Sequence, residues 1–149
     1  MITQDEFKIL LGYKKKFKTD DLIDLHTPRW ERDIVSVESN DTFVLNYHHG
    51  IINFQKYTFN NRHPFIVLLR FDSMGTHTNP DSDGKSFCGP HVHIYREGFG
   101  DKIAFPVSEI GLDENNLKRE AVLPVFLRYC NIQNHPPVSS AYQPTLFSK

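Results

Sequence analysis

Two histidines separated by one residue, His91 and His93, are the strongest candidates for chemistry in this sequence. They occur in the stretch GPHVHIYREGFGDK, which is typical of the beginning of a β-strand. Alternate side chains of a strand share one face of the sheet, so we expect both imidazoles to point the same way. Two ring nitrogens that converge from one rigid strand can chelate a single metal ion, and histidine is the commonest metal ligand in proteins. The spacing therefore indicates a metal site.

Two further side chains could complete the shell of ligands around a metal. Cys88 lies just before the strand, and His77 lies in the same polar segment, residues 73–90, further from the strand. With the histidine pair they offer three imidazoles and one thiolate, a ligand set that suits tetrahedral zinc. We therefore expect zinc to be bound by four residues: His77, Cys88, His91 and His93. The alternative is that the histidines only occupy a half-polar sheet face.

The same histidines could instead be catalytic. Asp72 ends the preceding apolar strand and could replace one metal ligand, while Arg70 in that strand could bind phosphate. A histidine pair beside a carboxylate can transfer protons. In this alternative His91, His93, Asp72 and Arg70 form the site of a phosphodiesterase or RNase-type toxin. A structural zinc site is closed and a catalytic one keeps an open position, so the participation of Cys88 separates the two hypotheses.

The segments before the cluster predict a helix and then a series of strands. Thr3 and Glu6 have the spacing of a capping box, and the apolar residues after them predict a helix of about three to four turns. Lysines at positions 14, 15, 16 and 18 favour a solvated helix end beside the negative pole of the helix. Alternating or apolar segments predict antiparallel strands at 33–38, 42–47, 51–59, 65–71, 91–95 and 103–105.

A second helix is predicted near the C-terminus, from about Asp113 through Cys130, and Pro124 is expected to kink or split it. The order helix, strands, helix predicts an α+β fold with a mainly antiparallel sheet of about five to seven strands and both helices packed on one face. Residues 1–131 are expected to form one domain, and residues 132–149, rich in Pro, Ser and Asn, an extended arm or tail.

Composition narrows the classes of protein that the sequence can encode. The chain has 149 residues, of which 39% are hydrophobic, enough for a core without disulfides. Its net charge of −1 argues against a dedicated nucleic-acid binder, although a weak direct contact with nucleic acid stays open. The chain has only two cysteines, no signal-peptide pattern at its N-terminus and no apolar run of roughly 20 residues. We therefore expect a cytoplasmic protein that does not enter membranes.

Residues 68–106 resemble a family of small uncharacterised proteins of bacteria and their mobile elements. The pattern is an apolar strand ending in Arg-x-Asp, a His-containing loop, Pro-His-x-His, and a Gly-x-Gly-Asp-Lys run. The matching residues are Arg70, Asp72, His77, Pro90, His91, His93, Gly98, Gly100, Asp101 and Lys102. The pattern is also loosely similar to the TumE-like toxins of toxin–antitoxin pairs. The resemblance implies a gene involved in conflict between bacteria and phages.

The hypothesis that combines these observations is a non-enzymatic metalloprotein. Zinc would pin the segment 73–90, and the resulting surface would bind a protein partner. That partner could be a nucleic-acid-processing enzyme, which the protein would inhibit or regulate. The sequence does not indicate an oligomeric state.

Overall fold

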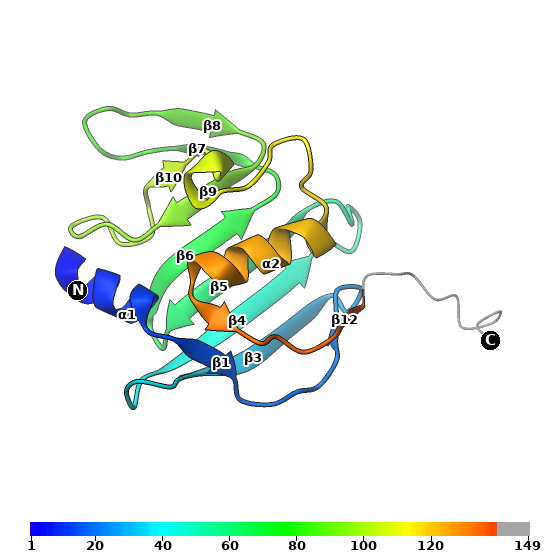
Figure 1. The fold of residues 1–149 in the computed structure, drawn as a ribbon. Helices are drawn as coiled ribbons and strands as arrows, with labels where there is room; N and C mark the ends of the chain where they lie inside the picture. The colour runs from blue at the N-terminus through cyan, green and yellow to red at the C-terminus, as the bar shows by residue number, and fades with distance from the viewer. Residues whose placement is uncertain (140–149) are drawn as a thin grey trace.

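A computed structural model describes residues 1–139 of the chain (Figure 1). Its elements, in chain order, are α1 (Gln4–Gly12), β1 (Lys15–Phe17), β2 (Ile23–Asp24), β3 (Arg29–Ser36), β4 (Thr42–His49), β5 (Tyr57–His63), β6 (Ile66–Asp72), β7 (Thr76–Thr78), β8 (Ser86–Cys88), β9 (His91–Ile94), β10 (Ala104–Phe105), the 3₁₀ helix η1 (Val107–Ile110), α2 (Arg119–Tyr129), β11 (Ile132–Gln133) and β12 (Val138–Ser139).

One sheet dominates the described part of the chain. Its eight strands lie in the order β10-β9-β6-β5-β4-β3-β1-β11. All neighbours pair antiparallel except β1 and β11, which are parallel. Two short pairs, β2 with β12 and β7 with β8, lie outside this sheet. The predicted α+β class and the mainly antiparallel sheet are confirmed, and the sheet has more strands than we predicted.

One face of the sheet carries the hydrophobic core. Alternate residues of the central strands, such as Phe43, Tyr47, Phe59 and Phe71, are buried on this face because strand side chains alternate between faces. Helix α2 crosses this face in Figure 1, and the rings of Phe126 and Phe59 lie 5.8 Å apart. Helix α1 joins the core elsewhere, through Phe7 packed on Tyr95, and its expected position on the same face as α2 stays a prediction.

The largest difference between predicted and observed strand boundaries is at β5. We predicted a strand at 51–59, but β5 covers Tyr57–His63. Ile51 and Ile52 are largely exposed, in a bend that follows β4. Two consecutive isoleucines have high β-propensity, but strand pairing and burial outweigh local propensity. His48 and His49, which lie between two of the predicted strands, form the end of β4.

The two α-helices also differ in extent from the prediction. The capping box is confirmed, because Thr3 Oγ1 accepts from the Glu6 amide and Glu6 Oε1 accepts from the Thr3 amide, but α1 has only nine residues. Helix α2 begins at Arg119 and continues through Pro124 without being split. The carbonyl that lost its partner to Pro124 belongs to Glu120, an exposed residue of the first turn where water can bind it.

Two segments expected to lack regular structure contain short strands. The polar segment 73–90 folds as the β7–β8 hairpin. In the expected C-terminal arm, β11 pairs with β1 and β12 pairs with β2. The rest of that predicted arm, residues 140–149, lies outside the described residues.

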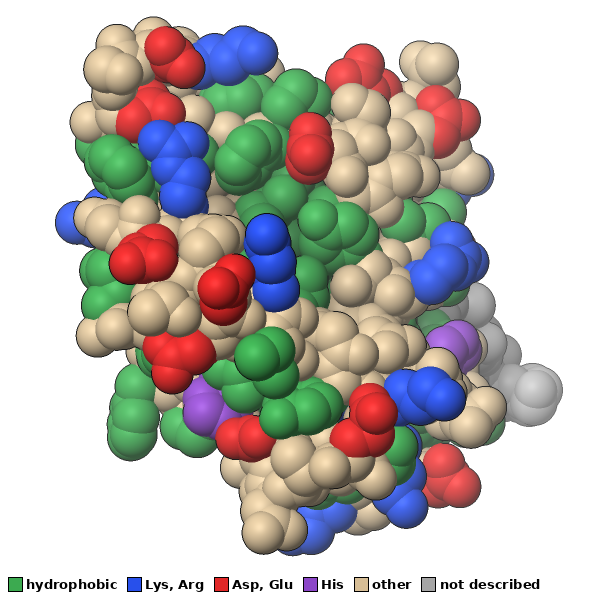
Figure 2. All heavy atoms as spheres, turned by 60° about the vertical axis from the view of Figure 1, so that its left-hand side comes forward, with side chains coloured by type: hydrophobic (Ala, Val, Ile, Leu, Met, Phe, Trp, Pro, Cys, Tyr) green, Lys and Arg blue, Asp and Glu red, His purple; other side chains and the backbone are tan. Residues whose placement is uncertain are grey.

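The surface has no dominant charge on the face drawn in Figure 2, where acidic and basic side chains are interspersed. This distribution agrees with a net charge of −1. Within residues 1–139, neither helix is long and apolar enough to cross a membrane. Recognition of a charged partner therefore depends on local groups rather than on the overall field of the protein.

We predicted that Lys15 belongs to a solvated helix end, but the structure buries this residue. Its side chain is 1% exposed and Nζ donates to three carbonyl oxygens, those of Leu11 at 2.7 Å, Tyr13 at 3.0 Å and Cys130 at 2.7 Å. These carbonyls lie at the C-terminal ends of α1 and α2, where helices carry partial negative charge. Burial lowers the pKa of Lys15 to about 8.

We expect the free energy of unfolding to rise with pH between about 8 and 10.5 because of Lys15. In this window the unfolded chain keeps the Lys15 proton and the folded chain loses it, so the unfolded state binds more protons. The gain is at most about 3 kcal/mol, from the size of the pKa change. Denaturant titrations of the wild type and Lys15→Met across this window measure it.

The exposed neighbour Lys16 supplies the matched control, as Lys16→Met. Burial raises the pKa of the Cys130 thiol to about 12, which lowers stability as pH rises, but all three proteins share this group. The result to compare is therefore the difference between proteins. A Lys15→Met profile that runs parallel to the wild-type profile would contradict the prediction.

Candidate metal centre

The second face of the sheet carries polar side chains, and Asp72, His91 and His93 meet there. In the register of β6 with β9, Asp72 lies opposite His91 and Arg70 lies opposite His93. The residues between them, Phe71 and Val92, point into the core. Alternation along two paired strands therefore brings all four polar side chains to one face, as the sequence predicted for the two histidines.

Both histidine rings are held by backbone carbonyl groups. His91 Nδ1 lies 2.8 Å from the carbonyl oxygen of Gly89, and His93 Nδ1 lies 2.9 Å from that of Asp101. A carbonyl oxygen can only accept, so each Nδ1 carries the proton. In the neutral ring Nε2 then carries the free lone pair. Metal-binding histidines in proteins are oriented in this way by a partner at the other nitrogen.

The Nε2 atoms converge on one carboxylate oxygen. Asp72 Oδ2 lies 3.5 Å from His91 Nε2 and 3.3 Å from His93 Nε2. All three ligand atoms lie within 4.8 Å of one another. For metal bonds of about 2.1 Å in a tetrahedron, neighbouring ligand atoms are about 3.4 Å apart. The three residues therefore form a group that could hold a metal ion.

The charge states of the cluster suit the binding of a cation. Burial opposes ionisation of Asp72, but the charge and the hydrogen bond of Arg70 lower the pKa of this carboxyl well below its usual range. Thr58 Oγ1 also donates to Asp72 Oδ1 at 2.8 Å. Burial lowers the pKa of His91, so its ring is neutral near pH 7. The cluster thus combines a carboxylate with a neutral imidazole.

Arg70 occupies a central place beside these ligands. Its Nε donates to Asp72 Oδ2 at 3.0 Å and its Nη1 to Asp101 Oδ2 at 3.2 Å. Its Nη2 lies 2.9 Å from His93 Nε2, which accepts this hydrogen bond in the tautomer described above. Arg70 therefore holds the carboxylate and one imidazole together, and it adds a permanent positive charge beside the cluster.

His77 lies near the cluster but outside the group of three converging ligands. Its ring centre is 4.7 Å from that of His93 and 6.0 Å from that of His91. Its Nε2 lies 2.7 Å from the carbonyl oxygen of Lys102, so Nε2 carries the proton and Nδ1 keeps the lone pair. His77 therefore forms a wall of the site.

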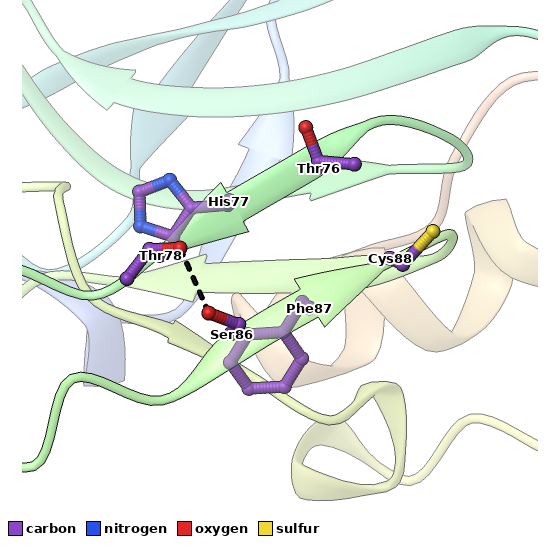
Figure 3. A pocket seen from close by; sticks show the side chains of 6 residues that line it. All are labelled: Thr76, His77, Thr78, Ser86, Phe87 and Cys88. Carbon is purple, nitrogen blue, oxygen red and sulfur yellow. Dashed lines mark hydrogen bonds between the residues drawn. The ribbon is translucent and has the colours of Figure 1, made fainter.

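Cys88 belongs to the opposite face of the β7–β8 hairpin. In the hairpin register Cys88 lies opposite Thr76, whereas His77 lies opposite Phe87. Directly opposed residues share a face, so His77 and Phe87 face one way and Cys88 the other. The Cys88 sulfur points away from the His77 ring in Figure 3. The structure thus does not assemble the four-residue shell that the sequence suggested.

Sequence reasoning missed several residues around the cluster. A cavity of about 350 Å³ lies above it, and His48, Lys56 and Thr58 contribute to its walls. Alternation from the buried Tyr57 and Phe59 would have placed Thr58 on the polar face. The position of His48 and Thr58 beside Asp72 depends on the register of β4, β5 and β6, which the sequence alone does not specify.

The fold and site define an α+β protein in which a histidine–aspartate cluster lies on the polar face of an antiparallel sheet. The chain belongs to the DUF6978 family, described as a family of unknown function, whose sequence profile matches residues 2–132. No curated protein and no solved structure matches the chain.

The hydrogen bonds of the cluster predict which nitrogen of each ring is protonated. In metal-free protein at pH 8 to 9 we expect Nδ1–H tautomers for His91 and His93, because each Nδ1 faces a carbonyl. We expect the Nε2–H tautomer for His77, whose Nε2 faces the Lys102 carbonyl. Long-range ¹H–¹⁵N NMR spectra distinguish the two forms. Proton attachment at Nε2 of His91 or His93 would contradict this arrangement.

Proposed function

We propose that the protein binds one zinc ion through Asp72, His91 and His93. The observation that carries this proposal is the convergence of two Nε2 atoms on Asp72 Oδ2, at 3.5 and 3.3 Å, with both Nδ1 atoms held by carbonyls. Two imidazoles and a carboxylate form a ligand set found in catalytic zinc sites and also in iron sites. Zinc fits because the two distances from Asp72 Oδ2, 3.5 and 3.3 Å, match the edge of a tetrahedron of ligands around this ion.

This site is proposed to be catalytic rather than purely structural. Cys88 faces away from the cluster, so three protein ligands remain and a fourth position is open towards the cavity. A zinc ion in such a site supplies a bound water of lowered pKa, which can act as a nucleophile. Lys56 and Arg70 line the same cavity and add positive charge that suits an anionic substrate. We propose hydrolysis of a phosphate ester.

Zinc binding at His93 requires a rearrangement of one side chain. Arg70 Nη2 lies 2.9 Å from His93 Nε2 and must leave this lone pair when the nitrogen binds a metal. The two hydrogen bonds of the guanidinium to Asp72 and Asp101 come from Nε and Nη1 and do not use Nη2. The Nη2 group would then be available to donate to a phosphate oxygen.

The broader predictions made from the sequence remain proposals. They comprise a cytoplasmic location, a place in conflicts between bacteria and phages, a relation to TumE-like toxins, and regulation of a nucleic-acid-processing partner. The near-zero net charge gives a long-range electrostatic role little support.

Metal analysis of purified protein tests the zinc proposal. We expect close to one zinc per chain in the wild type, and affinity at least about 100-fold lower in His91→Ala and Asp72→Ala, because each substitution removes a ligand. We expect Cys88→Ser to keep wild-type zinc, since the thiol faces away from the cluster. Mass spectrometry for metals and calorimetric titration provide the two measurements.

Circular dichroism of each variant shows whether a loss of zinc merely reflects unfolding. Loss of zinc in a folded Cys88→Ser protein would instead support the hypothesis of a structural site with four ligands, one of which is Cys88. A wild-type protein that takes up no zinc, even when the ion is added during refolding, would rule out the metal centre.

One contact favours a second candidate function, cleavage of phosphodiesters without a metal. Arg70 Nη2 occupies the His93 lone pair that a metal would need, and its charge repels a divalent cation. In this case the neutral His91 ring takes the proton from the attacking 2′-hydroxyl of RNA. As the new O–P bond forms, the bond between phosphorus and the 5′ oxygen breaks, and water protonates the leaving oxygen. Arg70 stabilises the negative charge on the phosphoryl oxygens.

The two candidates respond differently to chelation and to conservative substitution. For the metal-free mechanism we expect RNA cleavage that is insensitive to EDTA and about 100-fold slower in Arg70→Lys, because lysine cannot reproduce the bidentate guanidinium. Arg62→Lys, at a position on the same sheet face, is the matched control. Cleavage that EDTA abolishes and zinc restores would instead assign the reaction to the metal centre.

A further inference from the structure

The cavity above the cluster continues across the sheet. A second cavity, of about 290 Å³, lies over β3 and β4 and is lined by Arg29, Trp30 and Asn46 among others. Both cavities have three lining residues in common, His48, Thr58 and Arg70. The two hollows therefore adjoin and form one groove that begins at Asp72, His91 and His93.

The register of the strands gives this groove its direction. On the polar face, Arg29 of β3 lies opposite His48, His48 opposite Thr58, Thr58 opposite Asp72, and Asp72 opposite His91. These five residues therefore form a row perpendicular to the strands. At the usual spacing of neighbouring strands the row is about 19 Å long. That length exceeds a single nucleotide and suits an extended chain.

The charges along the groove are mostly positive and partly unpaired. Glu31 is within 3.6 Å of Arg62, and Asp72 is bound by Arg70. Arg29 and Lys56, in contrast, form no ion pair with any residue of the part of the chain that the structure describes. These two cations flank His48 on either side and leave positive charge for a ligand.

The depth of the cluster limits what can reach it. The side chains of His91 and His93 are only 4% and 2% exposed, so a reacting phosphate has to enter the cavity. Met74, Thr76 and His77, which belong to β7 and the turn before it, wall the cavity on one side. A flexible single strand can bend a phosphate into such a site, whereas a stiff duplex keeps its backbone outside.

We propose that the groove binds a single-stranded nucleic acid, with Arg29 and Lys56 contacting phosphates on either side of His48 and one phosphodiester placed at the cluster. This inference rests on the proposed hydrolytic site for the position of the reacting phosphate. The Trp30 indole packs on Tyr47 at the core face of the sheet, so contacts with phosphates rather than stacking on bases would hold the strand. The shared chemistry is the phosphodiester backbone, which RNA and DNA both supply.

Fluorescence anisotropy with a labelled ten-nucleotide strand tests the groove. The strand is offered as RNA, as DNA and as a duplex, to metal-free protein so that binding needs no turnover. We expect Arg29→Ala and Lys56→Ala each to weaken single-strand binding by about tenfold or more, because each removes a charged contact. Each should also reduce the slope of log affinity against log salt by about one. Lys8→Ala, at an exposed position on α1, should bind like the wild type.

Several outcomes would overturn the proposal. Equal binding by the wild type, Arg29→Ala and Lys56→Ala would contradict binding of the strand in the groove. Duplex binding as tight as single-strand binding would contradict the preference for a single strand. A preference between the RNA and DNA arms identifies the natural backbone. If the protein binds the strand through Arg29 and Lys56 but takes up no zinc, the groove proposal is supported and the zinc proposal is contradicted. If it takes up zinc and hydrolyses an ester but binds no strand, the zinc proposal is supported and the groove proposal is contradicted.

Discussion

The antiparallel register between β6 and β9 is the constraint on which the site depends. It sets Asp72 opposite His91 and Arg70 opposite His93, so that four polar side chains meet on one face. A shift of one residue in this pairing would move the histidines to the core face and the hydrophobic residues to the polar face. The burial of Phe71 and Val92 in the core opposes such a shift, because it would expose both. Packing on one face therefore fixes the chemistry on the other.

The turn after β9 completes the site. Gly98 and Gly100 have positive φ values, +90° and +64°, which glycine adopts without the steric cost that other residues incur. The Arg96 amide donates to the Gly100 carbonyl and closes this turn. Asp101 is thereby brought back beside the strand, where its carbonyl accepts from His93 and its carboxylate accepts from Arg70. The Gly-x-Gly-Asp run that follows the histidines thus has a structural role in orienting His93.

The sequence was informative where a single strand decides the geometry and uninformative where two segments must meet. The shared face of His91 and His93 follows from alternation alone, and the proximity of Asp72 follows from the end of an apolar strand. The orientation of Cys88 depends on the register of a hairpin, and polar residues gave no sign of that hairpin. The same limit applies to Lys15, whose three carbonyl partners come from the ends of two helices.

The two faces of the sheet also explain why the cluster can hold charges without weakening the core. Asp72, His91 and His93 lie on a face opened to solvent by the cavity, while Phe71 and Val92 share a single hydrophobic cluster with α2. An ionised carboxylate in the core would cost several kcal/mol. On the polar face Arg70 and Thr58 compensate for it by donating hydrogen bonds to the two carboxylate oxygens of Asp72. The positive charge of Arg70 beside Asp72 thus stabilises the buried carboxylate. The same positive charge allows an anion to bind in the groove.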